Sequence, residues 1–252
     1  MDLRDGSMEM TEAGPRVGIL IVARNGLALT KGAVRTALGQ DYPVEVMVVD
    51  NDSGDGTSQW LKTKRGVTVV SFQEQRSLAG CWNYGLRAFW KAGADCVLVM
   101  NNDCEVRPDA VRLLLDHGGE FVTCVSVDSL DRMGWPEGGA KALARVLKGS
   151  RPHPDFSCFL IRKAVTDKGI WFNEDCWPAY CEDSFFHVEM HKSGIRAICV
   201  DVPFLHHGAS TLKSASTQEQ ERIRKGADQN RQRFREKYGC LPGSKGYEKL
   251  FA

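Results

Sequence analysis

Acidic and amide side chains stand directly after two apolar runs in the first half of the sequence. Asp50 follows the run at 44–49, and the tripeptide Asn101-Asn102-Asp103 follows the run at 97–100. Oxygen ligands of this kind suit Mg²⁺ or Mn²⁺, and a carboxylate at the tip of an early strand also accepts a base N–H or a ribose hydroxyl. Asp and Asn are equally typical of turns, because their side chains form hydrogen bonds with nearby backbone. The residues alone leave both interpretations open.

Two groups of side chains in the second half could also take part in catalysis or bind a metal ion. Glu182 and Asp183 follow an aromatic segment at 177–181, where partial desolvation raises the pKa of a carboxyl group toward that of a general base. Acids are also favoured at a helix N-terminus, and both interpretations can hold together. His206 and His207 follow a short apolar run. Histidine is a common metal ligand, although a histidine after a strand more often has a structural role.

Alternating strands and helices must position these side chains. Continuous apolar runs predict buried strands at 17–23, 44–49, 67–72 and 96–100. Apolar spacing and caps predict helices at 27–40, 57–61, 78–92 and 108–115. This alternation indicates an α/β domain with a mostly parallel sheet. Both polar clusters then fall at the carboxyl ends of strands, where ligands bind on such sheets.

The second half is less regular. Apolar runs predict strands at 121–127, 156–161 and 195–200. Residues 128–155 are rich in loop signals around a short helical stretch predicted at 140–147. A polar, strongly charged helix is predicted at 215–237.

Composition and charge exclude several classes of protein. The 252 residues are 42% hydrophobic and carry 33 Lys and Arg against 32 Asp and Glu, so a uniformly basic nucleic-acid binder is excluded. The basic charge collects in residues 213–252, which hold ten Lys and Arg against five Asp and Glu. No apolar run approaches the 18 or so residues that span a membrane. We expect a disordered leader at 1–15, without the pattern of a signal peptide, and a cytoplasmic protein.

Several common catalytic and binding motifs are missing from the sequence. None of the nine cysteines forms a C-x-x-C pair, so a zinc ribbon or a thioredoxin-like site is not indicated. Most of the cysteines sit in apolar runs and are typical of small buried hydrophobes. The sequence also lacks a Walker A loop, a G-x-G-x-x-G loop and a G-x-S-x-G elbow.

The order of the motifs nevertheless resembles one known family. The chain is similar to family 2 glycosyltransferases of the GT-A fold, close to the rhamnosyltransferase-like branch, over roughly residues 16–212. The residues that carry the resemblance are 17–22, 40–57, 78–85, 97–109, Phe172-Asn173-Glu174 with Glu182-Asp183, and 206–210. The resemblance implies a single Rossmann-like domain at 16–212 with a mostly parallel mixed sheet flanked by helices. Residues 213–252 would be a basic helical extension.

The same resemblance implies an inverting, metal-dependent transfer of a sugar from a nucleotide-sugar donor to an acceptor hydroxyl. UDP-sugars are favoured, and dTDP- and GDP-sugars are alternatives. Asp183 would be the catalytic base and Glu182 its support. Asp103 and His206 would bind Mn²⁺ or Mg²⁺, with His206 preferred to its neighbour. The donor would be held by Ala23, Asn25, Asp50, Asn83, Asn101 and Asn102.

Two departures from the family pattern bear on these roles. Asn101 replaces the first acid of the family's D-x-D motif, so metal binding there depends on Asp103. Asn173 replaces the acid of its F-D-E motif. The resemblance gives no guide to residues 126–155, where acceptor or sugar specificity often lies in the family.

The acceptor and the class of protein stay open at this point. A saccharide or glycan intermediate is the expected acceptor. The basic helix at 215–237 could instead meet anionic lipid at a membrane surface or a nucleic acid, including a modified base in DNA as acceptor. It is also typical of a solvated helix with internal ion pairs. A nucleotidyltransferase on a related fold, or an inactive nucleotide-binding protein, are the competing classes.

Overall fold

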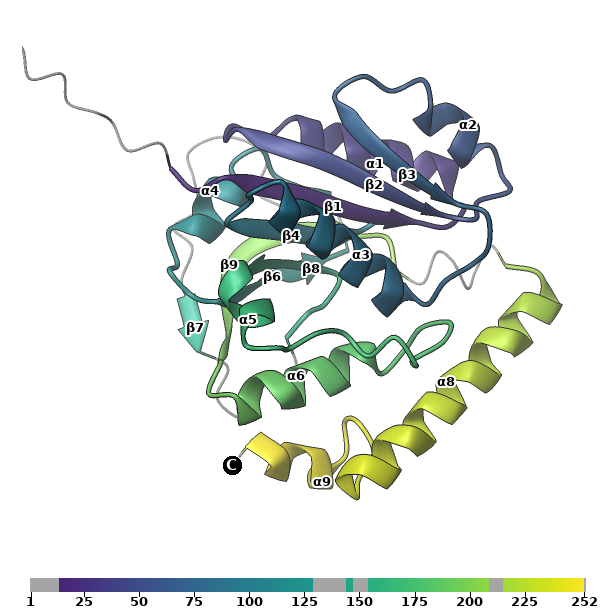
Figure 1. Ribbon diagram of the computed structural model, residues 1–252, viewed down its shortest axis with the longest axis vertical. Helices are drawn as coiled ribbons and strands as arrows, with labels where there is room; N and C mark the ends of the chain where they lie inside the picture. Colours follow the sequence, from purple (N-terminus) through teal and green to yellow (C-terminus); the bar gives the residue numbers. More distant parts are fainter. Residues whose placement is uncertain (1–13, 129–143, 147–153, 209–214, 252) are drawn as a thin grey trace, which may run out of the picture.

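The computed structural model describes residues 14–128, 144–146, 154–208 and 215–251. Within these residues the chain forms a nine-stranded sheet with helices packed against both faces (Figure 1). The strands are β1 (Val17–Ala23), β2 (Val44–Asn51), β3 (Val67–Phe72), β4 (Cys96–Asn101), β5 (Cys104–Val106), β6 (Phe121–Val127), β7 (Ala144–Val146), β8 (Cys158–Arg162) and β9 (Ala197–His206). The helices are α1 (Leu27–Leu38), α2 (Thr57–Leu61), α3 (Leu78–Lys91), α4 (Ala110–Leu115), α5 (Lys163–Asp167), α6 (Glu182–Lys192), α8 (Thr217–Tyr238), α9 (Lys245–Glu248) and the 3₁₀ turn η2 (Lys249–Phe251).

The sheet is parallel in its first half and mixed in its second. The strand order is β3-β2-β1-β4-β8-β6-β9-β5, and β7 pairs with β9 off this path. Strands β3, β2, β1 and β4 pair in parallel, and β6 pairs in parallel with β9. The pairs of β8 with β4 and β6, and of β9 with β5 and β7, are antiparallel. The predicted α/β fold with a mixed sheet is confirmed, and the parallel pairs of its first half are those that the apolar runs indicated.

Burial on both faces explains why β1 lies inside the sheet. All seven residues of β1 are buried. Ile19 and Ile21 pack into a core with α1 and α4, whereas Leu20 and Val22 pack into a second core with α3 and α6. Alternate residues of a strand point to opposite faces, so one apolar run supplies both cores. The sequence of a strand that is buried on both faces is therefore a continuous apolar run and does not alternate between apolar and polar residues.

Glycine allows α3 to approach β1 closely. A Cβ atom on Gly18 of β1 would lie 2.5 Å from two ring carbons of Phe89 in α3. Phe89 itself is buried in the core between the helix and the sheet. A side chain at position 18 would therefore push the helix away from the strand.

The second half differs from the predictions at several elements. The helix predicted at 140–147 is wrong for 144–146, which form β7, and its other residues lie outside the described part of the chain. The short strand gains its hydrogen bonds from β9, a distant partner that local helical spacing does not reveal. The last strand, predicted at 195–200, begins at Ala197 and runs on to His206 because β5 and the end of β6 pair with its residues 203–206.

Helix α8 is the long charged helix that the sequence predicts. It begins after Ser216, whose hydroxyl accepts a hydrogen bond from the backbone N–H of Glu219 at 3.2 Å, and it ends at Gly239 in the left-handed conformation. In Figure 1 it runs from the edge of the sheet past α6 toward α9. No described helix is long and apolar enough to cross a membrane. Residues 1–13 of the predicted leader lie outside the described part of the chain.

Candidate active site

A pocket of about 680 Å³ lies at the carboxyl ends of β1, β2 and β4. One wall comes from these strand ends and includes Arg24, Asn51 and the tripeptide Asn101-Asn102-Asp103. Residues 154–157 line the pocket beside these strand ends, since the backbone N–H of Asn101 donates to the carbonyl oxygen of Ser157 at 2.9 Å. The segment that leads into α6 also lines the pocket, together with Ile223 of α8. The size suits a small-molecule ligand, and the position is the usual ligand site of an open α/β sheet.

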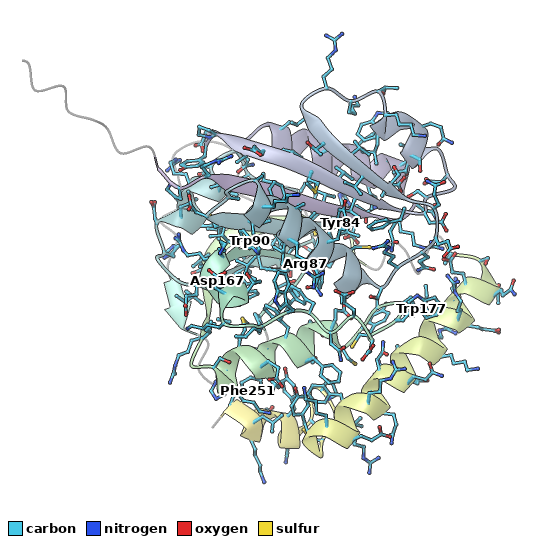
Figure 2. The ribbon with its side chains drawn as sticks, viewed as in Figure 1. Tyr84, Arg87, Trp90, Asp167, Trp177 and Phe251 are labelled. Carbon is cyan, nitrogen blue, oxygen red and sulfur yellow. The ribbon has the colours of Figure 1, made fainter. Side chains whose placement is uncertain are left out.

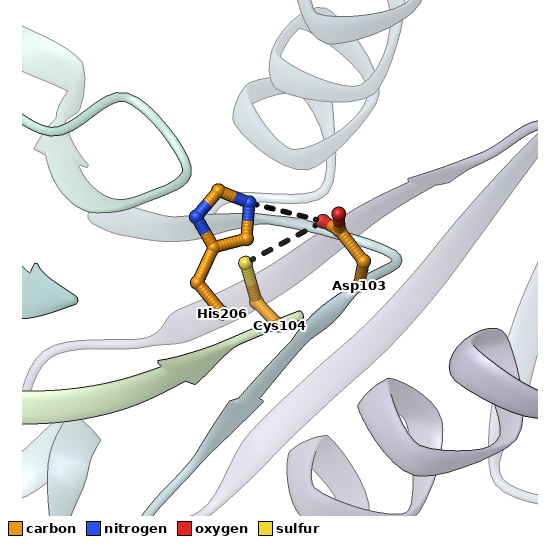
Figure 3. A group of neighbouring side chains, drawn as sticks. All are labelled: Asp103, Cys104 and His206. Atoms are coloured by element: carbon orange, nitrogen blue, oxygen red, sulfur yellow. Dashed lines mark hydrogen bonds and ion pairs between the residues drawn. The ribbon is translucent and has the colours of Figure 1, made fainter. Parts of the chain in front are cut away.

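Strand pairing brings Asp103 and His206 together. A tight turn joins β4 to β5, and β5 pairs with β9 so that Cys104 lies opposite His206. The backbone N–H of His207 donates to the carbonyl oxygen of Asp103 at 3.0 Å. His206 Nε2 consequently lies 3.5 Å from Asp103 Oδ1, and both side chains face the pocket (Figure 3).

The donor atoms of this pair fit a hard divalent cation. Asp103 offers carboxylate oxygens and His206 an imidazole nitrogen, and both suit Mn²⁺ or Mg²⁺ with further oxygen ligands. Cys104 lies within 4.8 Å of the same atoms. Burial raises the pKa of its thiol well above the usual range, and Sγ lies 3.4 Å from the carbonyl oxygen of Ser157. Cys104 therefore donates a hydrogen bond as a neutral thiol, and its soft sulfur suits Mn²⁺ or Mg²⁺ less well than carboxylate oxygens do.

The two adjacent histidines have different surroundings. The hydrogen bond to Asp103 raises the pKa of His206, and the charge of Asp155 acts in the same direction. His207 lies outside the pocket lining, with Nε2 3.2 Å from Oε1 of Glu105. Alternate residues at the end of β9 and after it point to opposite sides, which separates the two rings.

Glu182 and Asp183 form the first turn of α6. The helix starts after Cys181, which has a left-handed backbone with φ of 70°. Glu182 is buried, and burial followed by the charge of Asp183 raises its pKa to about 8. The half-buried Asp183 accepts a hydrogen bond from the backbone N–H of Ser184 at 2.6 Å. Both acids line the same pocket as Asp103. The two interpretations of these acids therefore hold together, because they start a helix and one of them is desolvated.

Two buried polar atoms in the pocket wall have no partner among the described residues. They are Nε1 of Trp82, which is a donor, and Oε2 of Glu182. Buried polar groups in folded proteins are almost always hydrogen-bonded. Both atoms are covered by the surrounding protein, so they do not face a ligand bound in the pocket.

The other predicted donor-binding residues lie around the pocket without lining it. Asp50 is buried at the end of β2, and its carboxylate accepts hydrogen bonds from Ser53 N–H at 3.2 Å and from the hydroxyl of Ser58. Asn25 follows β1, and its side-chain oxygen accepts the N–H of Gly54 at 2.8 Å. Ala23 is the buried last residue of β1.

Two of the predicted asparagines form internal bridges. Asn83 of α3 donates to Glu174 at 2.8 Å and exchanges two hydrogen bonds with the backbone of Phe172. Asn102 donates to the carbonyl oxygen of Asn25 at 2.9 Å and to the hydroxyl of Thr30 at 3.0 Å. Asn102 nevertheless lines the pocket, whereas Asn83 does not.

The structure thus gathers six of the ten predicted site residues around one pocket. They are Asn101, Asn102, Asp103, Glu182, Asp183 and His206, whereas Ala23, Asn25, Asp50 and Asn83 lie behind its wall. Sequence reasoning missed Arg24, Asp155 and Tyr180, which also line it. Arg24 had a signal, since it directly follows β1 at the ligand end of the sheet. Asp155 carries no such signal, because it lies in the segment 126–155, for which the family resemblance gives no guide.

A comparison with protein families identifies related sequences. Residues 18–170 match the family model described as Glycosyl transferase family 2. A curated relative is the succinoglycan biosynthesis protein ExoO of Rhizobium meliloti (strain 1021), which is 29% identical over 120 residues. That alignment covers 46% of this chain and 34% of the relative, so the similarity spans about a third of the length of ExoO.

Solved structures share the fold over almost the whole chain. The mannosyltransferase PcManGT from Pyrobaculum calidifontis, solved with GDP-Man and Mn²⁺, has a TM-score of 0.63 at 21% identity and matches 95% of this chain and 69% of its own. TarS 1-349 of S. aureus, solved with UDP-GlcNAc, has a TM-score of 0.61 at 16% identity and matches 94% of this chain and 70% of its own. At these identities the likeness establishes the GT-A fold.

Proposed function

This chain belongs to glycosyl transferase family 2 and is a glycosyltransferase, and from that premise we propose that it is an inverting, metal-dependent enzyme. It moves a sugar from a nucleotide-sugar donor to an acceptor hydroxyl, with a UDP-sugar as the first candidate and a GDP-sugar as the second. One observation carries the proposal. The Asp103–His206 pair and the Glu182–Asp183 pair line the same pocket.

The wall at the strand ends suits the donor. A divalent cation held by Asp103 and His206 would neutralise the charge that develops on the diphosphate leaving group. Asp50 keeps acceptor capacity, because its two hydrogen bonds to Ser53 and Ser58 leave about two of the four lone-pair sites of a carboxylate. Because Asp50 is buried and does not line the pocket, its role toward the nucleobase stays a prediction from the family resemblance. PcManGT and TarS were solved with GDP-Man and UDP-GlcNAc, which supports both candidate donors.

The α6 wall suits the acceptor. Asp183 takes the proton of the acceptor hydroxyl. In the same step the hydroxyl oxygen of the acceptor bonds to the anomeric carbon, and the bond from that carbon to the phosphate oxygen breaks. A single displacement of this kind inverts the anomeric configuration. Glu182, with its raised pKa, keeps its proton and so avoids a second negative charge beside the base.

We propose a saccharide as the acceptor. The support comes from the name of ExoO, a protein of succinoglycan biosynthesis. Helix α8 gives less support to an acceptor on DNA or on anionic lipid. Four of its seven basic side chains contact other residues of this chain, namely Arg222, Arg231, Arg233 and Lys237. Two pairs lie within the helix, Arg222 with Glu219 and Arg231 with Asp228.

Nucleotide release tests this function directly. The chain is incubated with UDP-GlcNAc, UDP-glucose or GDP-mannose, with Mn²⁺ or with EDTA, and free UDP or GDP is measured. We expect metal-dependent release from one donor. Asp183→Asn should lower kcat by at least about 100-fold, the lower range for general base catalysis, with the nucleotide still bound.

The control is Asp167→Asn, which removes an exposed acid of α5 on another side of the molecule (Figure 2). It should leave release unchanged. Turnover by Asp183→Asn at the wild-type rate would contradict the assignment of the base. Release that is equally fast in EDTA would contradict the role of the metal.

A further inference from the structure

The segment that leads into α6 is held from outside at four successive carbonyl groups. The carbonyl oxygen of Pro178 accepts the backbone N–H of Leu78 at 2.9 Å. The three other oxygens face one side chain of α8. The amide nitrogen of Asn230 lies 3.4 Å from the oxygen of Trp177, 3.0 Å from that of Ala179 and 3.1 Å from that of Tyr180. A single amide therefore holds most of the segment.

Asn230 is fixed in the orientation that these contacts need. Its side chain is fully buried. Its oxygen accepts a hydrogen bond from Nη1 of Arg233 at 3.0 Å, and the same nitrogen of Arg233 lies 2.5 Å from the carbonyl oxygen of Asp175. Because the oxygen is engaged by an arginine, the NH₂ group must face the carbonyl groups.

The segment requires external support because of its backbone. Tyr180 and Cys181 have φ of 76° and 70°, in the left-handed region that side chains with a Cβ rarely adopt. A residue in this conformation is strained and persists only where its surroundings enforce it. Glu182 and Asp183 follow at once as the first turn of α6. The conformation at 180–181 therefore sets where that turn begins and where its acids point.

Helix α8 is shaped to lie against this segment. A Cβ atom on Gly226 would lie 2.5 Å from Cδ of Pro178 and 2.7 Å from the carbonyl oxygen of Trp177. Figure 2 shows Trp177 beside α8, and Arg222 lies over its ring at 5.1 Å. At the far end of the helix, Phe234 packs edge-on against Phe185 of α6, with ring centroids 4.9 Å apart.

We propose that Asn230 is a positioning residue for Asp183, acting through the three carbonyl groups of the segment 177–180. The inference rests on the proposed function, in which Asp183 is the base. It makes α8 part of the acceptor side of the active site. Asn230 touches neither donor nor acceptor, so its loss should act on the chemical step and leave donor binding unchanged.

Two variants disturb the segment in different ways. Asn230→Asp keeps the shape of the side chain but replaces the NH₂ donor by an oxygen facing three carbonyl oxygens. Gly226→Ala introduces a methyl group against Pro178 without touching Asn230, and it decides the question where Asn230→Asp does not fold. Gln229→Ala, on the exposed side of the same helix, is the matched control.

The readout separates positioning from general damage. For the donor that wild type turns over, UDP-GlcNAc or GDP-mannose, kcat and KM of nucleotide release are measured together with the Kd of UDP or GDP. We expect kcat to fall at least about tenfold in both variants, because misplacement of a reacting group by about 1 Å can cost 100-fold. KM and Kd should stay within about twofold of wild type, and Gln229→Ala should match wild type throughout.

Three results would overturn the inference. The first is a wild-type kcat in the folded variants. The second is a loss of kcat with an equal loss of nucleotide affinity, which would mean that the whole pocket is disturbed. The third comes from Asp183→Asn assayed in parallel: its full activity would remove the base on which the inference depends. An inactive Asp183→Asn beside a fully active Asn230→Asp would instead leave the proposed function standing and refute the positioning role alone.

Discussion

At the scale of the residue, Glu182 shows how the fold changes the chemistry of a side chain. Its carboxyl group is buried at the start of α6, and one of its oxygens has no partner among the described residues. A carboxyl group in that position is stable only when protonated, and burial together with the charge of Asp183 raises its pKa to about 8. The sequence predicted a desolvated acid here because aromatic residues precede it. It could not predict which of the two neighbouring acids is buried, since that depends on how α6 packs.

The raised pKa of Glu182 makes stability depend on pH. The folded state binds a proton that the unfolded state, with a pKa near 4.3, has released, so the contribution to stability falls as the pH rises from about 4.5 to about 8. Glu182→Gln has no titrating carboxyl group, so the variant does not lose this stability as the pH rises. The gain in Tm of the variant over wild type should therefore be larger at pH 8.5 than at pH 5, by about 2–4 °C for each kcal/mol.

The measurement is thermal unfolding of both proteins across this pH range. Glu236→Gln, which changes an exposed acid of α8, should follow the wild-type curve. Parallel curves for wild type and Glu182→Gln would show that Glu182 is ionised in the folded protein.

At the scale of the element, the sequence predicted β1 to β4, β6 and most of β8, but it missed β5 and β7 and the length of β9. Strands β1 to β4 are buried on both faces and read as continuous apolar runs, so local pattern suffices. Strands β5 and β7 have three residues each and exist through their pairing with β9. The pairing with β5 and with the end of β6 carries β9 on to His206, which is why the expected strand was too short. Asp103 and His206 are brought together by the pairing of β5 with β9. The family resemblance could therefore indicate them as candidate metal ligands, whereas the local sequence pattern could not.

Close packing of α3 on β1 can be tested at one glycine. Gly18→Ala places a methyl group against the ring of Phe89, which is buried and cannot turn aside. Overpacking of this kind costs about 1–3 kcal/mol, so Tm should fall by several degrees. Thermal unfolding of the variant measures it.

The control for this prediction is Gly54→Ala, since a Cβ atom at Gly54 meets nothing within 4 Å. Its Tm should stay close to that of wild type. Adding Phe89→Leu to Gly18→Ala should cost less than Phe89→Leu costs in the wild-type background, because the methyl group then fills the space of the ring. Simple additivity of the two changes would argue against direct contact.

At the scale of the whole molecule, the pocket is assembled from segments far apart in the sequence. Arg24 after β1 pairs with Glu219 of α8 at 2.6 Å, and both side chains are largely buried. Helix α8 then passes the segment at 177–180 and packs against α6. The charge of residues 213–252 suggested a separate basic extension. We propose instead that α8 belongs to the active site. Charge patterning alone does not reveal this role, because the side chains by which α8 contacts the segment at 177–180 are few and include small residues.

The central claim is that this pocket binds a nucleotide through a cation held by Asp103 and His206. The most direct test is thermal unfolding of wild type and Asp103→Asn with UDP, GDP, dTDP or CDP, each with Mn²⁺ or with EDTA. A nucleotide at 100 times its Kd stabilises the folded state by about 2.7 kcal/mol, which raises Tm by several degrees. We predict such a shift with one nucleotide in Mn²⁺, a much smaller one in EDTA, and its loss in Asp103→Asn. No shift with any nucleotide, or a shift that is the same in EDTA and in Asp103→Asn, would contradict the account.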